Sequence, residues 1–95
     1  MPAADFNPPP DMDIRRKRLL FRSTHRGMQE LDVLLGGFAK QHASALDALQ
    51  TERFEALLEE NDNDLFGWIT GKTPVPPSFD HDLMHMLQTF TPDVA

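Results

Sequence analysis

The chain has 95 residues, a formal net charge of −6 and no cysteine. This length is enough for one small domain with a modest core, and the lack of cysteine excludes disulfides, thiolate metal sites and cysteine nucleophiles. No apolar run approaches the ~20 residues of a membrane-spanning helix, so we expect no membrane insertion. Residues 1–13 carry three aspartates and no basic residue, which favours neither a secretory signal nor a transit peptide. The expected location is the cytoplasm of a bacterium.

Charge is distributed unevenly along the chain. Residues 1–26 hold six basic residues and three acids, for a net charge of +3, whereas the remainder holds twelve acids and three basic residues, for a net charge of −9. Such a pattern predicts a basic end suited to an acidic partner and an acidic body that promotes solubility. A solvated basic helix face is the simpler interpretation of the same charges.

The first helix is expected to follow a proline-rich start. Four prolines within residues 1–11 predict an extended, disordered tail. The helix then begins at residue 12 or 13 and ends near residue 25. Leu20 and Phe21 are expected to face inward, while arginine and lysine stems cover the flank.

The second helix is predicted over residues 28–42 from apolar residues at three- and four-residue spacing. These are Met28, Leu31, Leu34, Leu35, Phe38 and Ala39. Gly36 and Gly37 interrupt the stripe, and each costs about 1 kcal/mol relative to alanine within a helix. They indicate either a kink or a close contact between helices, and the sequence leaves both open.

Three further helices are predicted from capping signals. Asp47 and Gln50 form a capping-box pair for a helix that reaches about residue 60. Asp62 is the expected N-cap of a fourth helix, which ends at Gly71. Three prolines then predict an extended connection, and Ser78 is expected to cap a fifth helix.

The fifth helix has a regular apolar stripe, formed by Phe79, Leu83, Met86, Leu87 and Phe90. No segment alternates with a period of two over the length of a strand, so the predicted fold class is all-α, a small single-domain bundle of five short helices. The helical domain is expected over residues 12–91, with a flexible C-terminus over residues 92–95.

The junction between the first two helices is the most informative part of the sequence. Gly27 suits a helix C′ position, because it adopts a left-handed conformation without a Cβ penalty. Arg22, His25 and Arg26 precede it, where cations favour the C-terminal end of a helix dipole. Glu30 follows at the start of the next helix. We expect an exposed corner in which Arg26 and Glu30 flank a bare glycine backbone that a partner can approach.

Two acidic or histidine-containing stretches imitate metal sites. His81 and His85 have the spacing of the zinc-protease pattern His-Glu-x-x-His, but a third ligand is missing, so a polar helix face is the preferred interpretation. Residues 60–64 resemble the start of a calcium loop without its glycine or its final bidentate glutamate. Helix capping accounts for these acids, and we expect no metal site.

Two blocks of sequence carry a family resemblance. They are Lys17-Arg18-Leu19-Leu20-Phe21-x-Ser23-x-x-Arg26-Gly27-Met28-x-Glu30-Leu31-Asp32 and Leu57-Leu58-Glu59-x-x-Asp62-x-Asp64-Leu65-Phe66-x-Trp68. In this order they resemble the succinate dehydrogenase FAD assembly factors, the flavinators of bacteria and mitochondria. The resemblance extends over residues 14–90. The chain departs from the family pattern at Thr24, where many relatives have an aromatic or larger residue, and at Gly36-Gly37.

The resemblance implies a five-helix protein without enzymatic activity of its own. Such proteins bind the flavoprotein subunit of succinate dehydrogenase, and in some bacteria that of fumarate reductase, and promote covalent attachment of FAD to it. We expect no tightly bound cofactor in this chain and a monomer in the absence of the partner. The implied partner-binding residues are Arg18, Ser23, Arg26, Gly27, Met28, Glu30, Asp32, Asp62 and Asp64.

The alternative is an antitoxin-like or nucleic-acid-binding regulatory module. Its phosphate contacts would come from the basic first helix, through Arg15, Arg16 and Arg18. The acidic body repels nucleic acid and no base-reading motif accompanies the arginines, so we expect no nucleic-acid partner.

Overall fold

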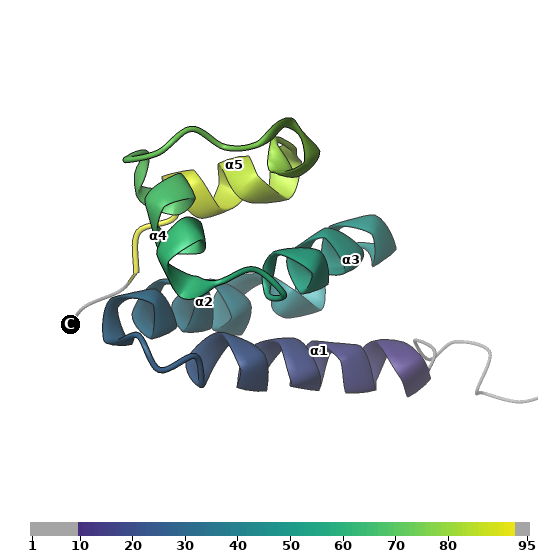
Figure 1. Ribbon diagram of the computed structural model, residues 1–95. Coiled ribbons are helices and arrows are strands. Elements are labelled where there is room, and N and C mark those ends of the chain that lie inside the picture. The colour runs from purple at the N-terminus through teal and green to yellow at the C-terminus, as the bar shows by residue number, and fades with distance from the viewer. Residues whose placement is uncertain (1–9, 93–95) are drawn as a thin grey trace, which may run out of the picture.

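The computed structural model describes residues 10–92, which form five α-helices and no strand (Figure 1). The helices are α1 (Pro10–Thr24), α2 (Gln29–His42), α3 (Ala48–Leu57), α4 (Asp62–Thr70) and α5 (Asp82–Thr89), with 3-10 turns η2 (Ala43–Ala45) and η3 (Pro77–Phe79). The predicted all-α bundle of five helices is confirmed. Within the described range, no helix has the length and apolar character needed to cross a membrane. Most of the expected disordered tail and flexible C-terminus, residues 1–9 and 93–95, lies outside the described residues. The first helix begins at Pro10, so its predicted start at residue 12 or 13 was too late and residues 10 and 11 are helical.

The helices surround one apolar core. α1 and α2 form an antiparallel hairpin along one side of the molecule, and α4 and α5 lie on the other side of α2 (Figure 1). Phe38 of α2 lies at the centre, because its ring makes edge-to-face contacts with Phe54 of α3 at 5.5 Å and with Phe90 after α5 at 5.6 Å. Trp68 of α4 stacks on Phe79 of η3 at 5.3 Å. Every helix therefore contributes to the same core.

The orientation of α1 differs from the sequence prediction. Leu19 is fully buried, whereas Leu20 is 37% exposed and Phe21 is 61% exposed, so the expectation that these two residues face inward was wrong. Successive residues on an α-helix are separated by about 100°, so only one of three consecutive apolar residues can point directly at the core. Leu19 takes that place together with Ser23, one turn later, which is also buried.

Gly36 allows α1 and α2 to approach each other closely. A Cβ atom at Gly36 would lie 2.6 Å from Cγ2 of Thr24, and one at Gly37 would lie 3.3 Å from the Phe90 ring. The helix α2 continues through both glycines as a single element, Gln29–His42. Of the two possibilities left open by the sequence, the structure therefore supports close contact between helices.

The predicted end of α4 and the start of α3 are confirmed. Asp47 and Gln50 form the reciprocal capping box, in which the Gln50 N–H donates to Asp47 Oδ1 at 2.8 Å and the Asp47 N–H donates to Gln50 Oε1 at 3.1 Å. Gly71 ends α4 in a left-handed conformation with φ of 79°. The predicted extent of α3 was too long, because the helix ends at Leu57 and residues 58–60 form a turn.

Two predicted N-caps were wrong. Asn61 caps α4 by accepting the Asp64 N–H at 2.9 Å, and Asp62 is instead the first helical residue. Ser78 lies in η3, and the cap of α5 is His81, whose Nδ1 accepts the Met84 N–H at 3.1 Å. Stacking of Phe79 on Trp68 fixes residues 77–79 as a separate turn, so α5 starts later and is shorter than predicted.

Candidate functional site

The corner between α1 and α2 is formed by residues 25–28, here called the Gly27 corner. Gly27 has a φ of 93°, which other residues rarely adopt. It is exposed, and a Cβ atom placed on it would meet no other atom within 4 Å. Met28 next to it is half-buried and packs against the core. At this corner the backbone of Gly27 is therefore exposed, next to a residue that is anchored in the core.

Arg26 braces this corner from the inside. Its side chain is only 11% exposed, and Nε donates to Asp62 Oδ1 at 2.7 Å. The two terminal nitrogens donate to the carbonyl oxygens of Leu58, at 2.8 Å, and Glu60, at 2.6 Å. The planar guanidinium has five N–H donors in a fixed fork, which suits it to a turn that presents several acceptors. The prediction of Arg26 as an exposed charged anchor was therefore wrong.

Asp32 completes the bracing from α2. Its Oδ1 accepts the backbone N–H of Arg26 at 2.9 Å. This bond gives the Arg26 N–H, just after the end of α1, an acceptor. Asp32 also lies in the first turn of α2, where a negative charge interacts favourably with the helix dipole. Asp32 and Asp62 are both partly buried and act on the corner through Arg26. Their contacts within the chain indicate a positioning role.

Ser23 lies inside the molecule and not at the surface. It is fully buried, and its hydroxyl has no hydrogen-bond partner among the described residues. The expectation that Ser23 lies at a contact surface does not fit this burial. The backbone of α1 is close to α2 at this point, because the Ser23 carbonyl oxygen lies 3.8 Å from the Cβ position of Gly36.

The remaining sequence-predicted residues lie at different places on the surface. Glu30 is exposed in the first turn of α2, beside the corner. Asp64 is exposed on α4 and accepts a hydrogen bond from the Asn61 side chain at 2.7 Å. Arg18 is exposed on α1, about two helical turns before Arg26. The structure thus brings Arg26, Asp32 and Asp62 together and leaves Arg18 apart.

Two features of this region were missed in the sequence. The carbonyl groups of Leu58 and Glu60 bind Arg26, and no side-chain pattern marks backbone acceptors. The Phe21 ring lies on the surface, stacked on His25 at a centroid distance of 3.9 Å. The exposure of Phe21 could have been predicted from the sequence. Leu19 and Ser23 lie one turn apart on the same face of α1, and Phe21 is not on that face.

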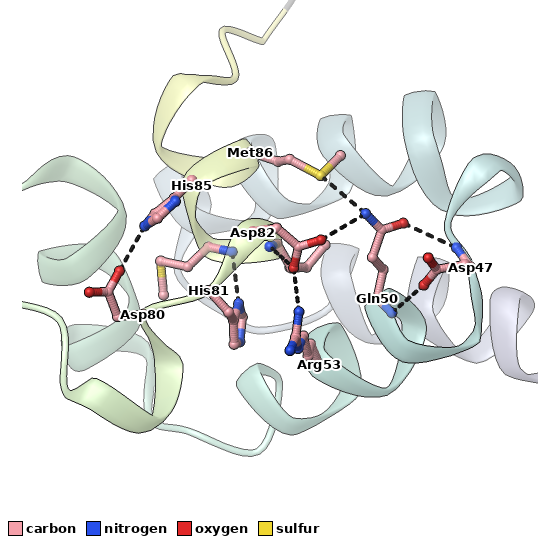
Figure 2. Close-up of polar contacts among 10 residues, drawn as sticks. Asp47, Gln50, Arg53, Asp80, His81, Asp82, His85 and Met86 are labelled. Carbon is pink, nitrogen blue, oxygen red and sulfur yellow. Dashed lines mark hydrogen bonds and ion pairs between the residues drawn. The ribbon is translucent and has the colours of Figure 1, made fainter.

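A polar cluster joins α3 to α5 and contains both histidines of the zinc-like pattern (Figure 2). Asp82 accepts hydrogen bonds from Gln50 at 3.1 Å and from Arg53 at 2.6 Å, and these two contacts lower its pKa. His81 caps α5, and His85 contacts Asp80 at 2.7 Å. The two histidine rings therefore make separate contacts. No group of three or more histidine, aspartate or glutamate side chains within residues 10–92 is placed to hold a metal ion.

Comparison with known proteins agrees with the family resemblance seen in the two sequence blocks. Residues 17–91 match the family described as Sdh5, flavinator of succinate dehydrogenase. The chain is 38% identical over 92 residues to "Succinate dehydrogenase assembly factor 2-B, mitochondrial" of Drosophila simulans, covering 93% of this chain and 59% of the relative. It is 40% identical over 82 residues to "Succinate dehydrogenase assembly factor 2, mitochondrial" of Danio rerio, covering 84% of this chain and 52% of the relative.

These relatives correct one expectation and confirm another. They are eukaryotic proteins named mitochondrial, which contradicts the expected location in a bacterial cytoplasm. The chain spans between half and three fifths of the length of these relatives. The resemblance seen in the two sequence blocks is confirmed, since the match covers both of them. The chain belongs to the family of succinate dehydrogenase flavinators, the succinate dehydrogenase assembly factors.

Proposed function

We propose that this protein binds the flavoprotein subunit of succinate dehydrogenase through the Gly27 corner and promotes covalent attachment of FAD to that subunit. The observation that carries the proposal is an exposed, left-handed Gly27, with open space around its Cβ position, in a chain of the flavinator family. A residue without a side chain lets the backbone of a partner come close. Fumarate reductase flavoprotein as a second client, and a monomeric state before binding, belong to the same proposal.

The bracing of the corner supports a binding role. Arg26 fixes residues 25–28 against the start of α4, and Asp32 fixes them against α2. A surface held in this way loses little conformational entropy when a partner binds. Glu30, exposed at the beginning of α2, adds a carboxylate beside the glycine for a basic or hydrogen-bonding group of the flavoprotein.

A binding protein can accelerate flavin attachment without a catalytic side chain. The reaction requires the flavin and the accepting side chain of the flavoprotein to be held in one geometry, and positioning of reactants contributes to rate. In our proposal the corner binds the attachment-competent conformation of the flavoprotein more tightly than other conformations, which increases its population. FAD remains with the flavoprotein, and this chain acts as a non-catalytic chaperone.

The basic surface of α1 offers little support for the nucleic-acid alternative. Arg15 donates to both carboxylate oxygens of Glu55, at 3.0 and 2.7 Å. Arg16 donates to the Leu46 carbonyl oxygen at 3.3 Å. Two of the three arginines that this alternative requires are thus engaged within the chain.

The test is co-expression with the flavoprotein subunit, with covalent flavin measured by in-gel fluorescence. We expect Gly27→Arg to reduce flavin attachment about tenfold or more, equivalent to a loss of about 1.4 kcal/mol in binding. Gly71→Arg is the matched control, because Gly71 has a similar φ of 79° and equally open surroundings. It imposes the same kind of backbone strain at another site. Normal flavin attachment with Gly27→Arg, or equal losses in both variants, would contradict the proposal.

A further inference from the structure

The outer face of α1 carries apolar side chains that no other described element covers. Ile14, Leu20 and Phe21 account for three of the five large apolar side chains that are exposed among the described residues. Ile14 is 48% exposed and Phe21 is 61% exposed. In Figure 1, α1 lies along the lower edge of the molecule, and all the other helices lie above it. These three apolar side chains lie on one helix and form a patch, unlike single exposed apolar residues scattered over a surface.

Phe21 separates two shallow hollows on this face. The first, of about 400 Å³, is lined by Ile14, Lys17, Arg18, Phe21 and Arg22. The second, of about 420 Å³, lies toward α2 and is lined by Lys17, Leu20, Phe21, Thr24, His25 and Lys40. The ring of Phe21 is held in place by stacking on His25. The outer face of α1 therefore has two apolar hollows, and the ring of Phe21 lies between them.

The rims of both hollows are cationic. No carboxylate lines either of them, although the chain carries fifteen acidic residues and a net charge of −6. Within residues 10–92, Lys17, Arg18 and Lys40 have no ion-pair partner, whereas Arg22 is paired with Glu59. Exposed cations around an apolar centre complement a ligand with carboxylates around an apolar stripe.

We propose that the outer face of α1 binds an acidic amphipathic helix of a partner protein. Ile14 and Phe21 are seven residues apart, which corresponds to about 10.5 Å along the helix. Apolar side chains spaced by one to two turns on a partner helix match this distance and enter the hollows on either side of Phe21. Carboxylates along that helix reach Lys17, Arg18 and Lys40. This surface adjoins the Gly27 corner and shares only His25 with it, and the inference does not depend on the proposed function.

Charge favours a partner helix over an anionic membrane as the occupant. A membrane surface is broader than α1, so it also meets exposed carboxylates beside the helix, such as that of Glu59, the ion-pair partner of Arg22. A single helix contacts only the local cationic rim, within the screening distance of about 8 Å at physiological ionic strength. The concave shape beside Phe21 also receives individual side chains, as in other helix-in-groove complexes.

The test uses the full chain and two synthetic peptides of about 18 residues, a length at which isolated helices can form. Both have leucine at positions i, i+3, i+4 and i+7. One has glutamate at the flanking positions and the other has lysine. We expect the glutamate peptide to bind at least about tenfold more tightly than the lysine peptide, and its affinity to fall with added salt. NMR chemical shifts should change along α1.

Variants locate the binding surface. Phe21→Ser, and separately the pair Lys17→Glu and Arg18→Glu, should each weaken binding of the glutamate peptide about tenfold or more. Leu49→Ser is the matched control, because Leu49 is an exposed apolar residue on α3, at 52% exposure, and lies outside both hollows. Gly27→Arg should also leave peptide binding unchanged. Circular dichroism checks that each variant keeps its helical content.

Several results would overturn the inference. These are absence of binding to the glutamate peptide at millimolar concentration, equal binding of both peptides, and an unchanged affinity in Phe21→Ser. Binding to vesicles that contain phosphatidylglycerol, lost in Phe21→Ser and without peptide binding, would assign the face to a membrane. Self-association that depends on Phe21 in analytical ultracentrifugation, again without peptide binding, would assign it to a second copy of this chain.

Discussion

Asp62 accepts a 2.7 Å hydrogen bond from Nε of Arg26, a residue 36 positions earlier in the chain. This contact connects the corner between α1 and α2 to the first turn of α4. The two carbonyl oxygens bound by the same guanidinium belong to the turn between α3 and α4. The Arg26 side chain thus connects the two halves of the bundle at the candidate site.

Arg26→Met should destabilise the fold by about 2–4 kcal/mol, because it leaves Asp62 without its cation and two carbonyl groups without a donor. The measurement is the free energy of unfolding in urea. Arg22→Met is the matched control, since its ion pair with Glu59 is largely exposed and such pairs contribute at most about 1 kcal/mol. Equal losses in both variants would contradict the bracing role of Arg26.

Gly36→Ala should destabilise the hairpin of α1 and α2 by about 1–3 kcal/mol through overpacking. The new methyl group would lie 2.6 Å from Cγ2 of Thr24. Thr24 cannot rotate away easily, because Oγ1 donates to the carbonyl oxygens of Leu20, at 3.0 Å, or Phe21, at 3.1 Å. Thr24→Ser removes the methyl group and keeps the hydroxyl, so the double variant should recover most of the loss. Thermal unfolding of the single and double variants measures this coupling, and additive effects would contradict it.

Stability should decrease in mild acid because of His81. Burial is the main cause that lowers its pKa from an ordinary value near 6.5, and Arg53 adds to it. The Nδ1 atom accepts the Met84 N–H, which requires an unprotonated nitrogen. As pH falls below about 6.5, the unfolded chain takes up the proton before the folded chain does, so the free energy of unfolding decreases through that window.

His81→Asn tests this pH dependence. Asparagine keeps a capping acceptor for α5 but does not titrate. Urea unfolding between about pH 7 and pH 5 should therefore show a smaller loss of stability in the variant than in the unchanged chain. Groups that do not interact with His81 contribute equally to both proteins, so the difference between the two pH profiles reports on His81 and its charged neighbours. Identical profiles would contradict the assignment.

The elements that could be predicted from the sequence are those determined by local contacts. The capping box of Asp47 and Gln50 and the left-handed residues Gly27 and Gly71 depend on neighbours within a few positions, and the structure has all of them. The predicted start of α5 was wrong, because residues 77–79 form a separate 3-10 turn whose Phe79 stacks on Trp68, eleven residues earlier. Local capping rules contain no information about such a contact.

The position of the candidate site could be predicted from the sequence, but which of its side chains are exposed could not. The glycine at the corner was identified correctly as exposed backbone. Arg26 was assigned to the surface because its acceptors, the Leu58 and Glu60 carbonyl groups, follow only from the tertiary fold. Leu20 and Phe21 were placed inward by hydrophobicity alone, whereas Leu19 and Ser23 are the fully buried residues of this part of α1.

Arg26 binds acceptors that come together only when the turn before α4 has formed. A chain in which only α1 and α2 have folded therefore keeps the Asp32 contact with the Arg26 backbone but lacks the three contacts of the Arg26 side chain. A partner that recognises the braced bend would bind the complete fold more tightly than the isolated hairpin. If the flavoprotein recognises this bend, as we propose, Arg26 connects that recognition to completion of the fold.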